Sequence, residues 1–147
     1  MDSFDEVLSL IPHRAPFLWV DKIISFAGDT IITEKKIPED LDVFAGHYPG
    51  NPLMPGVLLC EAIFQSGALL IGKMTQVQDS DLQSLPVLTR ISNAKFKRSV
   101  MPGDTVRIKV QLIESVSSVS FFKGNMKVGG KTAVQVDFAC AMIISDV

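Results

Sequence analysis

The sequence has 147 residues, of which 47% are hydrophobic and 20% charged, and its formal net charge is −2. These values suit one globular domain with a packed core and exclude a disordered or fibrous chain. A weakly acidic chain lacks the basic field that binds nucleic acid, and its acidic N-terminus lacks the basic and apolar regions of a signal peptide. We therefore expect a single domain over residues 1–147 that is cytoplasmic and binds no nucleic acid.

The first third of the chain contains one helix signal and two strand signals. The predicted elements are, in order, a helix over residues 3–10, a turn bracketed by Pro12 and Pro16, strands over 18–27 and 30–37, and an irregular segment over 38–54. Ser3 followed by Glu6 resembles a capping box, and Gly28-Asp29 is a hairpin-turn signal.

The longest apolar stretch predicts a helix from Gly56 to about Met74. Pro55 precedes it at a position that favours helix starts, and no strong breaker follows. The stretch is apolar on every side but contains Glu61, Gln65 and Ser66. A helix that is apolar all round is buried all round, so we expect a core helix that does not insert into a membrane.

The remaining residues alternate between apolar and polar side chains, which predicts strands. The predicted strands cover residues 87–98, 105–112, 117–128 and 131–144, with a bulge near Lys123-Gly124, a hairpin at Gly129-Gly130 and a polar loop over 76–85 that either gates a tunnel or only connects. The predicted fold is α+β: a long central helix wrapped by a curved antiparallel six-stranded sheet, with a short N-terminal helix. This arrangement is a hot-dog fold.

The first candidate catalytic residue is His47, one of only two histidines in the sequence. It lies in a segment that contains three prolines and three glycines within eleven residues, from Gly46 to Gly56. Such a loop has a fixed shape, and an imidazole transfers protons well near neutral pH. The other histidine, His13, is interpreted as structural because no acidic residue lies near it in sequence.

Glu61 is the second candidate. Its neighbours on the predicted helix are apolar apart from Gln65, and burial of a carboxyl raises its pKa, so that it can act as a general acid. The amides of Gly56 and Val57 are free at the helix start and suit a developing oxyanion on a thioester carbonyl. Base, acid and oxyanion site are the groups that elimination next to a carbonyl requires.

At this point the sequence resembles a known family. The run His-Tyr-Pro-Gly-Asn-Pro-Leu-Met-Pro-Gly-Val-Leu-Leu-Cys-Glu-Ala-Ile-Phe-Gln, which starts at His47, is similar to the signature of 3-hydroxyacyl-[acyl-carrier-protein] dehydratases of the FabZ type. The resemblance also covers the Pro-His-Arg-Ala-Pro segment from Pro12 and the Met-Pro-Gly-Asp turn from Met101. Tyr48 departs from the usual phenylalanine and is a possible gating residue.

The resemblance implies a dehydratase of fatty-acid biosynthesis that converts (3R)-hydroxyacyl thioesters to trans-2-enoyl thioesters. It implies a hot-dog dimer, often a trimer of dimers, in which His47 takes the C2 proton and Glu61 of the partner subunit protonates the departing hydroxyl. The Gly56 amide would hold the thioester oxygen, the Leu53 carbonyl would orient the imidazole, and Gln65 would hold the carboxyl. Apart from the phosphopantetheine arm that carries the substrate, no cofactor or metal is expected.

Two questions stay open from the sequence. Arg90, Lys95, Lys97 and Arg98 form the densest basic cluster, which is either a solvated strand face or a docking site for acyl carrier protein. The alternative functions are a hot-dog thioesterase, which would not need His47 before the helix, and a non-catalytic acyl-binding subunit.

Cys60 and Cys140 are expected to be buried free thiols.

Overall fold

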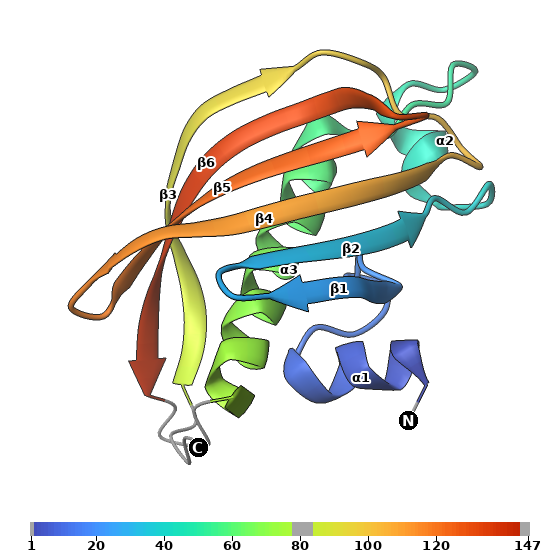
Figure 1. Cartoon of the computed structure of the whole chain (residues 1–147). Helices are drawn as coiled ribbons and strands as arrows, with labels where there is room; N and C mark the ends of the chain where they lie inside the picture. Colours follow the sequence, from blue (N-terminus) through green and yellow to red (C-terminus); the bar gives the residue numbers. More distant parts are fainter. Residues whose placement is uncertain (1, 78–83, 145–147) are drawn as a thin grey trace.

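A computed structural model describes residues 2–77 and 84–144, and the elements follow the predicted order. The elements are α1 (Ser3–Leu10), β1 (Lys22–Ala27), β2 (Thr30–Lys36), α2 (Val43–His47), α3 (Gly56–Val77), β3 (Ser84–Phe96), β4 (Thr105–Val116), β5 (Val119–Val128) and β6 (Lys131–Ile144). The strands form one antiparallel sheet in the order β1-β2-β4-β5-β6-β3. Figure 1 shows this sheet curving around α3, while α1 lies beside the lower half of the helix. The predicted hot-dog arrangement is confirmed.

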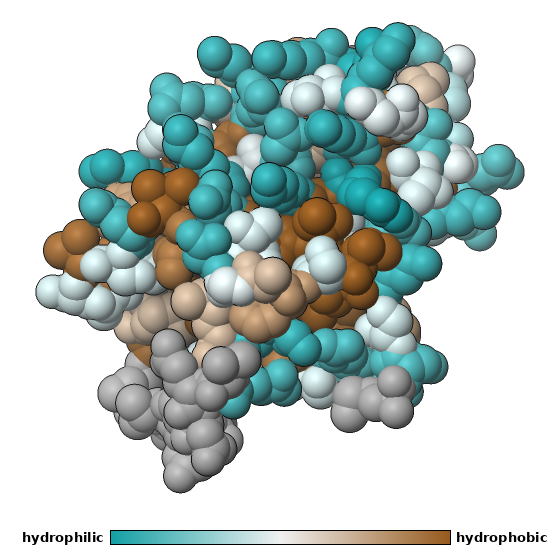
Figure 2. Space-filling view, viewed as in Figure 1, coloured by the Kyte–Doolittle hydropathy of each residue, from teal (hydrophilic) through white to brown (hydrophobic). Residues whose placement is uncertain are grey.

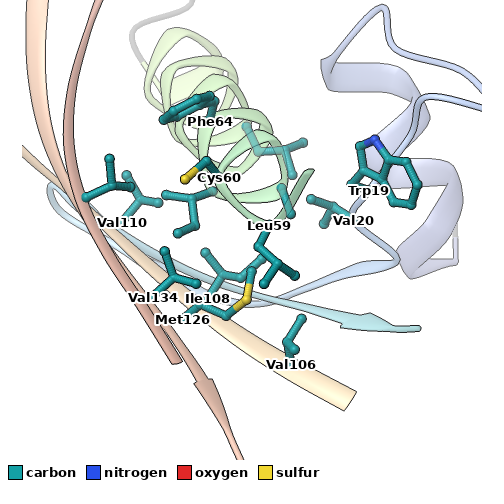
Figure 3. Packing of buried hydrophobic residues seen from close by; sticks show 14 of the residues in the cluster. Trp19, Val20, Leu59, Cys60, Phe64, Val106, Ile108, Val110, Met126 and Val134 are labelled. Atoms are coloured by element: carbon teal, nitrogen blue, oxygen red, sulfur yellow. The ribbon is translucent and has the colours of Figure 1, made fainter. Parts of the chain in front are cut away.

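Helix α3 is the core of the molecule. It has the length and apolar composition of a membrane span, but most of that apolar stretch is buried inside the protein. Figure 3 shows side chains of α3 packed between the sheet on one side and Trp19 and Val20 on the other. The inward row of β4 (Val106, Ile108 and Val110) is fully buried, as the alternating pattern predicts. The apolar composition of α3 therefore reflects burial of the helix against the sheet.

The predicted bulge at Lys123-Gly124 is wrong. Pairing between β4 and β5 runs without interruption through both residues, and the register shifts lie at Leu112/Glu114 and, between β5 and β6, at Met126/Lys127. Gly124 keeps its inward phase and is buried. A Cβ atom built there would lie 2.2 Å from Cγ2 of Ile63 on α3. A glycine at this position lets the helix approach the sheet, and its lack of a side chain made the alternation look broken.

Several other boundaries also differ from prediction. The N-cap of α1 is Asp2, whose side chain accepts a hydrogen bond from the Asp5 amide at 2.9 Å, so the capping box was misplaced by one residue. Glu6 instead forms an ion pair with Lys73, with Oε1 and Nζ 2.7 Å apart. The irregular segment contains α2, which Phe44 anchors in the core.

Strand ends shift for similar tertiary reasons. The first strand starts at Lys22 rather than residue 18, because the Trp19 amide donates to a side chain of α3 and not to a neighbouring strand. Helix α3 continues to Val77 and β3 starts at Ser84. The proposed gating or connecting loop is thereby reduced to residues 78–83, which lie outside the described residues. The two hairpin turns at Gly28-Asp29 and Gly129-Gly130 are confirmed, with positive φ at all three glycines.

Candidate active site

His47 is the last residue of α2, and the structure fixes the orientation of its ring. Nδ1 lies 2.9 Å from the carbonyl oxygen of Leu53. A carbonyl only accepts hydrogen bonds, so Nδ1 carries a hydrogen and is the donor of this hydrogen bond. In the neutral tautomer Nε2 is then unprotonated. The predicted contact between Leu53 and the imidazole is confirmed. The ring is thereby prepared to accept a proton at Nε2.

A cavity of about 400 Å³ lies in front of His47. Tyr48, Gly56 and Phe96 share its wall, together with Lys97 and Arg98. The Tyr48 ring is tilted against the imidazole, with 4.3 Å between ring centroids, and is 53% exposed. Tyr48 therefore lines the cavity with an exposed side chain, and its role as a gating residue stays a prediction.

Gly56 is the first residue of α3 and lines this cavity. A Cβ built on Gly56 would lie 2.8 Å from Cε1 of Phe96, so the ring of β3 occupies the volume that a side chain would need. The next residue, Val57, is 75% exposed. The first amides of a helix have no partner within the helix and lie at its positive end. Of the two predicted oxyanion donors, Gly56 lines the same cavity as His47.

Glu61 lies one and a half turns further along α3, in a different cavity of about 200 Å³. Its apolar lining comes from α3 (Phe64 and Ala68) and β3 (Pro86 and Leu88), and its polar members are His13, Glu61, Gln65 and Cys140. Burial raises the pKa of the Glu61 carboxyl, and a hydrogen bond from Gln65 opposes part of that rise. The expected upward shift has its expected physical cause, because a carboxylate is poorly solvated among apolar groups.

Gln65 is held in one orientation by three hydrogen bonds. Oε1 accepts from the Trp19 amide at 2.8 Å, and Nε2 donates to the Phe17 carbonyl at 2.8 Å and to Oε2 of Glu61 at 3.1 Å. Flipping the amide would place a donor against a donor and an acceptor against an acceptor, so the assignment of oxygen and nitrogen follows from the backbone partners. The predicted role of Gln65 as the group that holds the Glu61 carboxyl agrees with this contact.

The sequence did not reveal that Cys140 and His13 share the cavity of Glu61. Cys140 is a buried free thiol, as expected, and burial together with the nearby Glu61 charge raises its pKa to about 11. His13 lies 48 positions before Glu61, so no local spacing connects them. The interpretation of His13 as purely structural rested on sequence distance from an acidic residue, and the structure removes that argument by placing both in one cavity wall.

The predicted basic cluster divides into two groups. Lys97 and Arg98 line the cavity of His47, whereas Arg90 and Lys95 line depressions formed by the outer face of the sheet. All four side chains are exposed. Within residues 2–77 and 84–144, no group of three or more His, Cys, Asp or Glu side chains is arranged to hold a metal ion.

Comparisons with known proteins show the family of the chain. A family model described as the FabA-like domain matches residues 11–137. A 3-hydroxyacyl-[acyl-carrier-protein] dehydratase FabZ of Caulobacter vibrioides is 41% identical over 140 residues, which cover 95% of this chain and 86% of the relative. The corresponding protein of Actinobacillus succinogenes is 36% identical over 137 residues and covers 92% of this chain and 89% of its own length.

Solved structures support the fold. The dehydratase heterocomplex ApeI:P of Xenorhabdus doucetiae matches with a TM-score of 0.79 and 16% identity, covering 97% of this chain and 92% of that chain. A mutant thioesterase of Pseudomonas aeruginosa matches with a TM-score of 0.70 and 10% identity, covering 99% and 96%. At such identities dehydratases and thioesterases share only the fold, so the sequence relatives decide the family. The chain belongs to the FabZ-type family of 3-hydroxyacyl-[acyl-carrier-protein] dehydratases.

Proposed function

We propose that the protein is a hydro-lyase of fatty-acid biosynthesis that removes water from (3R)-hydroxyacyl thioesters and forms trans-2-enoyl thioesters. The observation that carries the proposal is that one side chain is set up to accept a proton and another to donate one. The hydrogen bond from Nδ1 of His47 to the Leu53 carbonyl leaves Nε2 without a proton, and burial raises the pKa of Glu61. His47 takes the C2 proton, the Gly56 amide with that of Val57 holds the thioester oxygen, and Glu61 protonates the departing hydroxyl.

The acyl chain is carried on the phosphopantetheine arm of acyl carrier protein, and the reaction takes place in the cytoplasm without a metal or another cofactor. The experiment that tests the function is dehydration of 3-hydroxyacyl carrier-protein thioesters of several chain lengths, followed by mass spectrometry. Loss of 18 Da from the acyl group is expected. Thioester hydrolysis instead of dehydration would favour the thioesterase alternative, and no reaction at any chain length would favour an acyl-binding subunit.

We propose further that the active site is shared between two copies of the chain. Within one chain His47 and Glu61 line different cavities, and strand β3 borders both of them. Phe96, near the end of β3, belongs to the His47 cavity, and Leu88, nearer its start, belongs to the Glu61 cavity. Antiparallel pairing of two β3 strands about a twofold axis places the Phe96 end of one strand beside the Leu88 end of the other. The His47 cavity of one chain then lies next to the Glu61 cavity of its partner.

The surface of β3 is suited to this pairing. β3 is an edge strand of the sheet, and an open edge is a template for another strand. Its exposed apolar side chains, together with Val57 at the start of α3, would be covered by a second copy; they are Leu85, Val87, Leu88, Ile91 and Phe96. On the face drawn in Figure 2, which has the strands β1, β2 and β4 at the front, other apolar side chains reach the surface among polar ones. A trimer of such dimers is the proposed larger assembly.

The raised pKa of Glu61 predicts the pH dependence of the reaction. The acid must be protonated before water leaves, so kcat is expected to fall as the pH rises through the pKa of Glu61. Gln65→Leu removes the hydrogen bond that lowers this pKa, and the alkaline limb should therefore move to higher pH.

The measurement is kcat against pH, with folding checked by circular dichroism because Gln65 also bonds the Trp19 amide and the Phe17 carbonyl. Gln111→Leu, on the exposed outer face of β4, is the matched control and should leave the profile unchanged. A limb that moves to lower pH in Gln65→Leu would contradict the assignment of Glu61 as the acid.

Lys97 and Arg98 are proposed to guide the acidic carrier protein to the mouth of the His47 cavity. Charge reversal of both is expected to lower kcat/KM for the carrier-protein substrate roughly tenfold at low salt, because electrostatic steering mainly affects encounter. The loss should shrink at high salt, where charges are screened. Lys109→Glu, on the outer face, is the control, and a neutral pantetheine thioester should react equally well with all variants. An equal loss with the neutral thioester would contradict docking.

A further inference from the structure

A groove of about 540 Å³ lies next to the cavity of Glu61, and the chemistry proposed above gives it no role. The end of α1, the second half of α3 and the start of β3 line it. In Figure 1 the lower half of α3 lies between the start of β3 and α1. This α1–α3 groove and the cavity of Glu61 have two lining residues in common, Ala68 of α3 and Pro86 of β3. The two cavities are therefore adjacent.

One face of α3 runs through both cavities. Its residues follow one another at spacings of four, three, four and three positions, which places their side chains on the same side of a helix; they are Glu61, Gln65, Ala68, Gly72 and Thr75. The first two line the cavity of the proposed acid, Ala68 lines both cavities, and the last two line the groove. An elongated ligand that passes the acid along this face therefore continues into the groove.

The lining of the groove is suited to an alkyl chain. Its apolar side chains include Leu8, Leu10, Ile11 and Ile71. Arg14, its charged member, donates hydrogen bonds to the main-chain carbonyls of Leu8, Ile11 and His13, so its guanidinium already has partners. A concave and mostly apolar surface next to a few polar catalytic groups is the usual form of a site for an apolar ligand.

Gly72 brings the wall of the groove close to the helix. A Cβ built on Gly72 would lie 3.2 Å from Cδ2 of Leu10 and 3.4 Å from the Leu10 carbonyl oxygen. The space between the helix and Leu10 is thus already filled. Because Gly72 and Leu10 both line the groove, a longer side chain at position 72 would extend into it or displace the end of α1.

We propose that the α1–α3 groove binds the far end of the substrate's acyl chain, and that the small residues Ala68 and Gly72 make the protein a dehydratase of long-chain substrates. This inference rests on the proposed function, which places C3 of the substrate at Glu61. The thioester end then faces His47 and Gly56 of the partner subunit, and the rest of the chain leaves Glu61 on the other side, where the groove lies.

Helix geometry gives the expected chain length. At about 1.5 Å per residue, Ala68 lies about 10 Å and Gly72 about 16 Å beyond Glu61 along α3. An extended chain advances about 1.2 Å per bond, since three bonds of an extended polypeptide span about 3.6 Å. With C3 at Glu61, the chain passes Ala68 at about its twelfth carbon and Gly72 at about its sixteenth. Chains of four to eight carbons do not reach the groove.

Leucine substitutions at the two small positions test this placement. The substrates are 3-hydroxyacyl carrier-protein thioesters of four, eight, fourteen and eighteen carbons. One methylene without room in an apolar site costs about tenfold or more, so Ala68→Leu is expected to lower kcat/KM at least about tenfold for the two longer chains. Gly72→Leu should do so for eighteen carbons only. Both should keep the two shorter substrates within about threefold of wild type. Gln111→Leu, on the outer face of β4, is the control and should change none of the four values.

Binding of saturated acyl carrier-protein thioesters, measured by calorimetry, is a second readout that needs neither turnover nor a variant. The dissociation constant of the wild-type protein should fall by up to about fourfold per added methylene, and should still be falling beyond twelve carbons. The inference is overturned if binding stops improving at eight carbons, if either leucine variant lowers kcat/KM equally for every chain length, or if Gly72→Leu excludes shorter chains than Ala68→Leu does. Long-chain binding without dehydration at any length would overturn the proposed function and leave the groove as an acyl-binding site.

Discussion

Replacing His47 by alanine or Glu61 by glutamine is expected to lower kcat for dehydration at least about a hundredfold. One positioned proton-transfer group contributes a factor of roughly 10² to 10⁴, and each substitution removes one such group. His47→Ala removes the bare Nε2 that the Leu53 carbonyl prepares, and Glu61→Gln keeps the shape of the side chain but cannot release a proton. Initial rates measured by mass spectrometry, with circular dichroism to confirm folding, give the result.

Mixing the two inactive variants tests whether the site is shared. In a dimer that combines His47→Ala with Glu61→Gln, one site carries both substitutions and the other contains an intact His47 and Glu61 from different chains. Random exchange of subunits makes half of the dimers mixed, so roughly a quarter of wild-type activity should return. A mixture that stays inactive after subunit exchange would place both groups in one chain. Near-normal activity of either single variant would show that its residue is not the acid or base.

Gly124→Ala is expected to lower the free energy of unfolding by about 1–3 kcal/mol, the usual cost of overpacking a core. The added methyl would lie 2.2 Å from Cγ2 of Ile63 and 3.6 Å from Cε1 of Phe138. Ile63 is fully buried on α3, and a β-branched side chain in a helix has one strongly preferred rotamer, so it cannot turn away. The methyl must therefore push the helix away from the sheet.

Chemical denaturation of Gly124→Ala and of a matched control measures this effect. Gly46→Ala is the control, because a Cβ at that position in α2 meets no atom within 4 Å. The control should be as stable as wild type, or more stable by up to about 1 kcal/mol, because alanine favours helix more than glycine does. Equal stabilities of the two variants would mean that Ile63 and β5 are not in close contact.

The fold was largely predictable from the sequence because its main signals are periodic and long. The fully apolar run after Pro55 has only one stable placement, inside a sheet, and the alternating rows of β4 and β6 supply the inward faces that surround it. The errors fall where a tertiary contact replaces a local rule. Trp19 gives its amide to Gln65 instead of a strand, and Gly124 is small because Ile63 needs the space.

Within the site, the sequence by itself determined His47, Gly56, Glu61 and Gln65. They lie within one short stretch whose residue types and helical spacing determine their chemistry. Only the tertiary structure decided which groups face one another. It separated His47 and Glu61 into two cavities along β3, divided the basic cluster, and brought His13 and Cys140 to Glu61. Such contacts join residues that are dozens of positions apart, and chain closure over those distances depends on the packing of the whole sheet rather than on any local pattern.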